Sequence, residues 1–199
     1  MTWGARAEPT AVRKLSLAEW ERLPEDDAGE LVRGVLVEEE MPSYVHEATL
    51  VWLMGMLLPW CRTHEARVVG SGLKYDLGGD TGRMPDLSVF LRGAARPPAQ
   101  GAARTPPSIA VEVVSSTPAD ARRDRIIKLS EYAAFGVAWY WLVDPELRSV
   151  EILELDEHGK YVHVVSTTDG TVPVPGCPGL VLDVDELWRE LEQAVAEGS

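Results

Sequence analysis

Two hydrophobic patterns alternate along the chain. Short apolar runs bounded by Gly, Pro or acidic turns predict β-strands, and longer apolar or amphipathic stretches predict helices. The predicted strands are 30–33 with 35–39, 67–70 with 73–77, 87–91, 109–114, 138–143, and 151–155 with 161–165. The predicted helices are a short one through 20–23, then 44–64, 117–135 and 185–196.

Capping signals support two of these helices. Ser16 and Glu19 have the spacing of a capping box, which starts the short helix. Thr117 supplies an N-cap before Pro118, and Gly136 ends the same helix. The long helix therefore lies between the strands 109–114 and 138–143.

This strand, helix and strand predict a parallel crossover. Both strands are almost continuously apolar, which is typical of strands buried on both faces. The Pro, Gly and Ala-rich stretch 93–107 has no apolar period and predicts a mobile surface loop between two strands of one sheet. We therefore expect one α/β domain over residues 1–199, with a mixed central sheet.

Composition and charge restrict the function. The 199 residues are 45% apolar, and 19 basic against 32 acidic side chains give a net charge of −13. This charge repels nucleic acid and anionic membranes, so a nucleic-acid function requires a local basic patch or a bound metal. The apolar stretch 48–60 is too short to span a membrane. Two distant cysteines and an N-terminus without a secretion signal predict a cytoplasmic protein without membrane association.

Glu112 is the most informative single residue. It lies in the middle of the apolar strand IAVEVV, where an unpaired buried charge costs several kcal/mol. A protein cation, a shifted pKa or a bound metal would compensate this charge.

A second carboxylate, Asp86, directly precedes the strand 87–91. If the two strands are neighbours, Asp86 and Glu112 converge on one divalent ion, for which oxygen ligands favour Mg²⁺ or Mn²⁺ over Zn²⁺. The next helix adds a cationic surface of the kind that phosphodiester chemistry requires. Its members are Arg122, Arg123, Arg125 and Lys128, of which the last two are three residues apart and share a helix face.

Each of these residues also has a purely structural interpretation. Glu112 and Asp86 could form a buried salt bridge with Arg125, or Asp86 could lie at an exposed strand end. The helix cations could form the solvated face of an amphipathic helix. His46 and His64 each precede Glu but lack the second His of a zinc-protease helix, and the chain has no phosphate-binding loop and no serine nucleophile elbow.

Several ordered motifs resemble one known family. These are ELVRG at 30–34, the His of PSYVHE, PDLSVF, IAVEVVSSTP, DRIIKLSEYAAFGV and YWLVDP. In order and spacing they resemble the Uma-two family of restriction-endonuclease-like proteins, over about residues 15–165. The resemblance implies a PD-(D/E)xK nuclease core, in which a mixed sheet is flanked by helices and an Asp and a Glu hold a divalent metal.

The resemblance also implies roles for individual residues. Asp86 and Glu112 match the metal ligands, and Glu30 matches an acidic residue that adds a ligand or holds a metal-bound water. The signature Lys is missing, because Val114 stands at its position. We infer that Lys128 on the next helix replaces it.

We therefore expect a metal-dependent endonuclease that hydrolyses DNA phosphodiester bonds with Mg²⁺ or Mn²⁺. Asp86, Glu112, Lys128 and Glu30 are the expected catalytic residues, and Arg122, Arg123 and Arg125 the expected DNA contacts. A two-fold homodimer suits cleavage of both strands of a duplex. The net charge and Val114 favour an alternative, a non-catalytic assembly or regulatory module that retains the nuclease fold. A small phosphoesterase acting on nucleotides is a third hypothesis.

Overall fold

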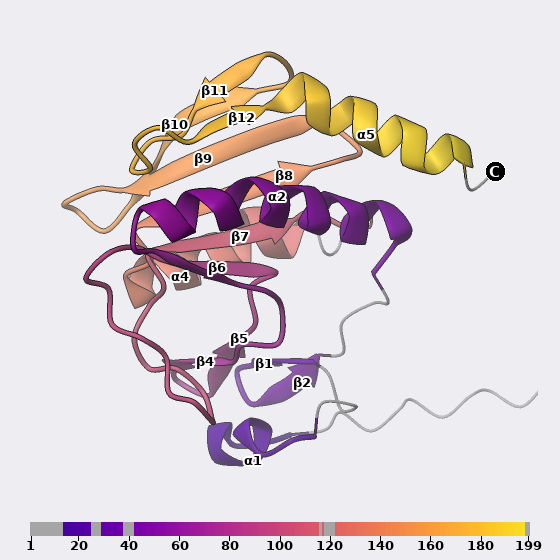
Figure 1. The fold of residues 1–199 in the computed structure, drawn as a ribbon. Coiled ribbons are helices and arrows are strands. Elements are labelled where there is room, and N and C mark those ends of the chain that lie inside the picture. The colour runs from indigo at the N-terminus through magenta and orange to yellow at the C-terminus, as the bar shows by residue number, and fades with distance from the viewer. Residues whose placement is uncertain (1–13, 25–28, 38–41, 116, 118–121, 198–199) are drawn as a thin grey trace, which may run out of the picture.

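The computed structural model describes residues 14–24, 29–37, 42–115, 117 and 122–197 (Figure 1). Its largest element is a six-stranded mixed sheet with the order β10-β9-β8-β7-β6-β3. These strands are β3 (Arg67–Val69), β6 (Leu87–Phe90), β7 (Ile109–Val113), β8 (Trp139–Asp144), β9 (Ser149–Leu155) and β10 (Tyr161–Thr167). β7 and β8 are parallel, and their register pairs Ile109 with Trp139, which confirms the predicted crossover.

Helices cover both faces of this sheet. On one face α2 (Tyr44–Thr63) and α5 (Val184–Glu197) pack on the larger core, to which Leu53, Val111 and Trp141 belong. On the other face a π-helical segment, η1 (Arg123–Lys128), continues directly into α4 (Leu129–Phe135), as Figure 1 shows behind the sheet. The fold is therefore the expected α/β sheet flanked by helices.

A second, four-stranded sheet lies beside the central one, in the lower part of Figure 1. Its order is β2 (Val35–Val37), β1 (Glu30–Val32), β5 (Thr81–Arg83) and β4 (Tyr75–Gly78). The short helix α1 (Leu17–Glu21) begins at the predicted Ser16 capping box and buries Trp20 against Gly82. A Cβ atom at position 82 would lie 2.3 Å from the Trp20 ring, so this packing requires glycine.

The other predicted elements agree with the structure except at three places. The segments 67–70 and 73–77 do not pair with each other, because β3 pairs with β6 and β4 pairs with β5. The segment 78–82, which was predicted as a turn, contains the first two residues of the unpredicted strand β5. The hairpin of β11 (Thr171–Pro173) and β12 (Val181–Asp183) was not predicted either. The stretch 93–107 is not wholly a surface loop, because Ala102 and Ala103 are buried.

Some predictions fall outside the described residues. These are the first residues of the helix at 118–121 and the strand end at 38–39. Within the described ranges, no helix combines the length and the apolar character that crossing a membrane requires.

Candidate active site

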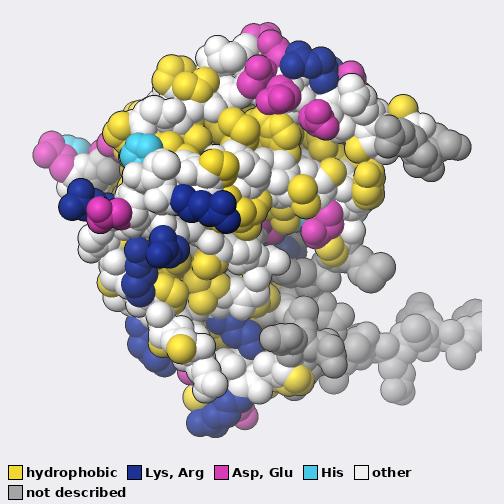
Figure 2. Space-filling view, viewed as in Figure 1, with side chains coloured by type: hydrophobic (Ala, Val, Ile, Leu, Met, Phe, Trp, Pro, Cys, Tyr) yellow, Lys and Arg dark blue, Asp and Glu magenta, His cyan; other side chains and the backbone are white. Residues whose placement is uncertain are grey.

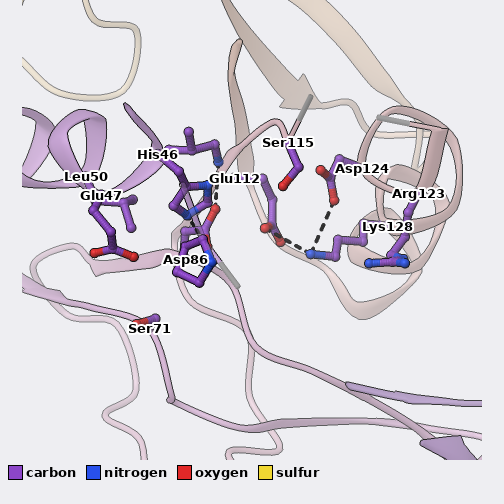
Figure 3. Close-up of a pocket in the computed structure, with 12 residues that line it drawn as sticks. His46, Glu47, Leu50, Ser71, Asp86, Glu112, Ser115, Arg123, Asp124 and Lys128 are labelled. Atoms are coloured by element: carbon purple, nitrogen blue, oxygen red, sulfur yellow. Dashed lines mark hydrogen bonds and ion pairs between the residues drawn. The ribbon is translucent and has the colours of Figure 1, made fainter. Parts of the chain in front are cut away.

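β6 and β7 bring Asp86 and Glu112 together. The antiparallel register places Leu87 opposite Val111, so Asp86, one residue earlier, lies opposite Glu112. The backbone N–H of Val113 donates a hydrogen bond of 2.7 Å to Asp86 Oδ2, which fixes this carboxylate at the start of β6. Both side chains line one cavity of about 130 Å³ (Figure 3). The expected convergence of the two carboxylates is therefore present.

Glu112 is buried and holds two hydrogen-bonding partners, both from the helix that follows β7. Lys128 Nζ lies 3.0 Å from Oε2, and the Tyr132 hydroxyl donates a 2.7 Å hydrogen bond to Oε1. Burial raises the pKa of Glu112 well above its ordinary value, and the negative charges of Asp86 and Asp124 raise it further, while Lys128 opposes them. Additional positive charge beside Glu112 would therefore favour its ionised form.

Lys128 is a buried cation directly beside Glu112. Its ammonium contacts three carboxylates, at 3.0 Å to Glu112, 3.3 Å to Asp124 and 3.4 Å to Glu30. Burial acts to lower the pKa of Lys128, but these carboxylates raise it well above the ordinary value. The side chain therefore stays protonated and can position or stabilise negative groups, but it cannot serve as a base at neutral pH.

Glu30 lies behind Lys128 and is not among the described residues that line the cavity. Arg83 Nη1 donates a 2.6 Å hydrogen bond to Glu30 Oε2, and the Met84 N–H donates a 3.2 Å bond to Oε1. Arg83 is completely buried and also pairs with Glu131. Burial acts to raise the pKa of Glu30, but Lys128 and Arg83 together lower it below the ordinary value. Glu30 is therefore placed to fix the position of the ammonium group.

The predicted cationic surface is only partly present. Arg123 lines the cavity, and Arg122 is exposed on the same helix outside the cavity lining. Arg125 points elsewhere: its guanidinium pairs with Asp144 at 2.9 Å and with Glu151 on β9. The expectation that Arg125 and Lys128 share a face is wrong, because the segment is π-helical and its wider turn changes which residues align. Arg125 also makes no salt bridge to Asp86 or Glu112 in the described structure.

Three polar residues at the site were not assigned roles from the sequence. Asp124 is a buried carboxylate in the cavity lining, and burial raises its pKa. Tyr132 orients Glu112, as described above. Their spacing in the sequence could have indicated both residues, because Asp124, Lys128 and Tyr132 follow one another at intervals of four residues. His46, in the first turn of α2, lies 3.4 Å from Asp86 Oδ1.

The donor set fits a Mg²⁺ or Mn²⁺ ion. Within the described ranges, no three His, Cys, Asp or Glu side chains group closely enough to hold a metal alone. Mg²⁺ is commonly bound by one or two carboxylates, with water and phosphate oxygens completing its shell. Asp86 and Glu112 offer such a pair beside the cavity. The cavity lining carries four carboxylates against two basic side chains, and a divalent cation would offset this excess.

Comparisons with known proteins agree with this fold and give the chain a family. Residues 17–185 match the model of the Uma2 family, which is described as "Putative restriction endonuclease". A protein from Anabaena variabilis ATCC 29413, whose crystal structure is described as that of "a putative nuclease belonging to DUF820", has a similar fold. The TM-score is 0.71 and the sequence identity 23%, over 89% of this chain and 99% of that chain. None of the curated proteins compared with the chain matches it. Because the family model covers most of its length, the chain belongs to the Uma2 family.

Proposed function

We propose that this protein is a metal-dependent endonuclease that hydrolyses DNA phosphodiester bonds with Mg²⁺ or Mn²⁺. The description of the Uma2 family supports a nuclease activity. The observation that carries the proposal is the position of Lys128, whose ammonium lies 3.0 Å from Glu112 in the cavity that Asp86 also lines. Two carboxylates and one ammonium around a small cavity are the groups that hydrolysis of a phosphodiester requires.

Each side chain has a distinct proposed role. Asp86 and Glu112 would hold the ion, which supplies Lewis acidity and lowers the pKa of water when it is bound. Lys128, held in its protonated form, orients the attacking water and offsets the negative charge that develops on the phosphate. Glu30 and Asp124 also contact the ammonium and fix its position. Water adds to phosphorus as the bond to the leaving oxygen breaks, and the proton that the water loses to solvent is balanced by the proton that the leaving oxygen takes up.

Arg122 and Arg123 are the proposed contacts for DNA phosphates. Arg123 borders the cavity, and Arg122 is exposed on the same helix. Arg125 is not included, because Asp144 and Glu151 already neutralise it.

One observation favours a second candidate, a non-catalytic assembly or regulatory module. The net charge is −13, and residues 144–199 alone carry thirteen acidic side chains against three basic ones. Such a surface repels DNA and could instead bind a basic protein.

Nicking of supercoiled plasmid distinguishes the two candidates. The full chain with Mg²⁺ or Mn²⁺ should nick the plasmid, and chelation of the metal should stop the reaction. Glu112→Gln and Asp86→Asn should reduce nicking to background, whereas Glu154→Gln, an exposed acid on β9, should not. Nicking that is as fast in Glu112→Gln as in the wild type, or no nicking of any DNA form by the wild type, would contradict the proposal.

A further inference from the structure

The helix α2 carries no charge over most of its length. No charged side chain occurs between Ala48 and Cys61, on any side of the helix. A helix that is apolar all round is usually surrounded by protein. The described residues cover one side of α2, where Leu53, Leu57 and Trp60 pack in the larger core. The opposite side is therefore apolar and exposed.

This exposed face runs along the middle of α2. Val51 is 72% exposed and Leu58 is 37% exposed, and Gly55 and Pro59 are exposed between and beside them. A groove of about 370 Å³ between α2 and α5 opens next to it, lined in part by Trp52 and the α5 residue Leu191. Figure 2 shows hydrophobic side chains gathered over α2 and the adjoining part of α5. We call Ala48, Val51, Trp52, Gly55, Leu58 and Pro59 the α2 face.

We propose that a second copy of this chain packs on the α2 face, with the two α2 helices antiparallel across a two-fold axis near Gly55. The charges at the ends of the face support this arrangement. Glu47 precedes Gly55 by eight residues and Arg62 follows it by seven, and both are exposed. In an antiparallel pair, Glu47 of each copy therefore lies opposite Arg62 of the other. A two-fold interface repeats this ion pair on both sides.

The described salt bridges of the single chain also favour this pairing, because they do not involve these two charges. Within the described residues, neither Glu47 nor Arg62 forms a salt bridge in the single chain. The net charge of −13 opposes self-association, but the α2 face itself is uncharged and its two ends carry opposite charges. A second copy therefore fits this face, because the two-fold axis places its Arg62 opposite Glu47 and its Glu47 opposite Arg62.

Gly55 suits the crossing point of the two helices. Glycine within a helix is less favourable than alanine, and a Cβ atom at position 55 would meet no described residue of the single chain within 4 Å. Packing inside the single chain therefore does not explain the glycine. Because interhelical distance depends on the side chains at the contact, glycine allows two copies to approach closely there. The same register places Leu58 of the second copy opposite Val51, beside the groove.

Sedimentation velocity of the full chain tests whether the α2 face forms a dimer interface. The wild type should be a dimer at micromolar concentration, and Val51→Glu should be a monomer that keeps the wild-type circular dichroism spectrum. Val162→Glu is the matched control, because Val162 is half exposed on the edge strand β10. A monomeric wild type, or a dimer that dissociates in Val162→Glu but not in Val51→Glu, would overturn the proposal.

Charge reversal tests the orientation. Glu47→Arg and Arg62→Glu should each weaken the dimer by about tenfold, because each single change places like charges opposite one another twice. The double variant should recover the wild-type dissociation constant. A double variant that is weaker than either single variant would contradict antiparallel packing.

Disulfide cross-linking tests the axis directly. Gly55→Cys has room for its side chain, and two copies of this cysteine should meet at the axis and form an intermolecular disulfide under mild oxidation. Ile126→Cys, an exposed control on η1 at the other face of the central sheet, should remain uncross-linked. A Gly55→Cys dimer that does not cross-link would place the axis elsewhere and overturn the proposal.

Discussion

At the scale of single residues, the site depends on how buried charges are compensated. Glu112 is buried in an apolar strand, and its charge is offset by Lys128 and by the Tyr132 hydroxyl. Glu30 is offset by Arg83 and Lys128. Removing one member of such a group leaves an uncompensated buried charge, which costs more free energy than the pair itself contributes.

Arg83→Met tests this compensation through pH. In the wild type the lowered pKa of Glu30 means that its charge stabilises the fold above the pKa of unfolded Glu, and that this contribution is lost as the pH falls through the lowered value. Without Arg83, burial favours the neutral form of Glu30. The variant should lose about 3–5 kcal/mol of unfolding free energy at neutral pH. The deficit should shrink as the pH falls toward the ordinary Glu value of 4.5.

Urea unfolding at neutral and acidic pH measures this difference. Arg104→Met is the control, since the Arg104 side chain is 66% exposed although it pairs with Glu21 and Asp76. It should cost less than about 1 kcal/mol at either pH. A deficit for Arg83→Met that grows on acidification would contradict the assigned ion pair.

Tyr132→Phe tests the hydrogen bond to Glu112. The variant keeps the ring and loses only the donor, so it should cost about 2 kcal/mol of unfolding free energy and lower the nicking rate by about tenfold. Tyr161→Phe removes a comparable hydroxyl, which donates to the Val137 carbonyl away from the site. The control should lose stability but keep its nicking rate. Equal nicking by both variants would show that Tyr132 does not position Glu112.

Sequence reasoning found the central residues of the site because their positions conflict with their surroundings. A glutamate inside IAVEVV and an aspartate at a strand entrance have few structural explanations, and the antiparallel register brings them together. Arg83 gave no such signal, because an arginine beside Met84 and Pro85 resembles an ordinary loop cation. Its complete burial depends on Glu30 and Glu131, which lie 53 and 48 residues away along the chain.

At the scale of elements, the π-helical segment η1 determines which side chains reach the cavity. It directs Asp124 and Lys128 inward and Arg125 toward β8 and β9. Segments of this kind are rare, occur frequently at functional sites, and have no sequence period that distinguishes them from an α-helix. The helix could therefore be predicted over its described part, which ends at Phe135 as expected, but the directions of its cations could not.

Arg125→Met tests whether Arg125 stabilises the fold and does not contact DNA. It should lower the unfolding free energy by about 1 kcal/mol, because its ion pairs are partly exposed, and leave the affinity for DNA unchanged. Arg122→Met combined with Arg123→Met should mainly weaken DNA binding. Fluorescence anisotropy with a labelled duplex and urea unfolding separate the two effects. Weaker DNA binding by Arg125→Met at unchanged stability would restore Arg125 as a DNA contact.

The second sheet shows where element prediction stops. The strand β5 reads Thr-Gly-Arg, which has no apolar alternation, and it follows a glycine-rich turn. Its glycine is required by Trp20, a residue 62 positions earlier whose ring covers it. Local pattern therefore predicts a loop, while tertiary packing makes a strand. The central strands β7 and β8 have almost continuous apolar runs and were predicted for that reason.

At the scale of the whole molecule, charge is distributed unevenly. The acidic excess is concentrated in residues 144–199, and few basic side chains border the cavity. If Arg122 and Arg123 provide the phosphate contacts, raising salt from about 50 to about 200 mM should weaken binding of duplex by roughly tenfold. The inactive Glu112→Gln variant with Mg²⁺ permits this measurement. A loss of more than about a thousandfold would indicate a larger basic surface than the proposed pair.

The central claim is that Asp86 and Glu112 hold one divalent ion beside Lys128. Crystals soaked in Mn²⁺ and measured at the manganese absorption edge test it most directly. We predict one anomalous peak within bonding distance of both carboxylates, and its loss in Glu112→Gln. A peak at other residues, or no peak at a Mn²⁺ concentration that supports nicking, would contradict the account.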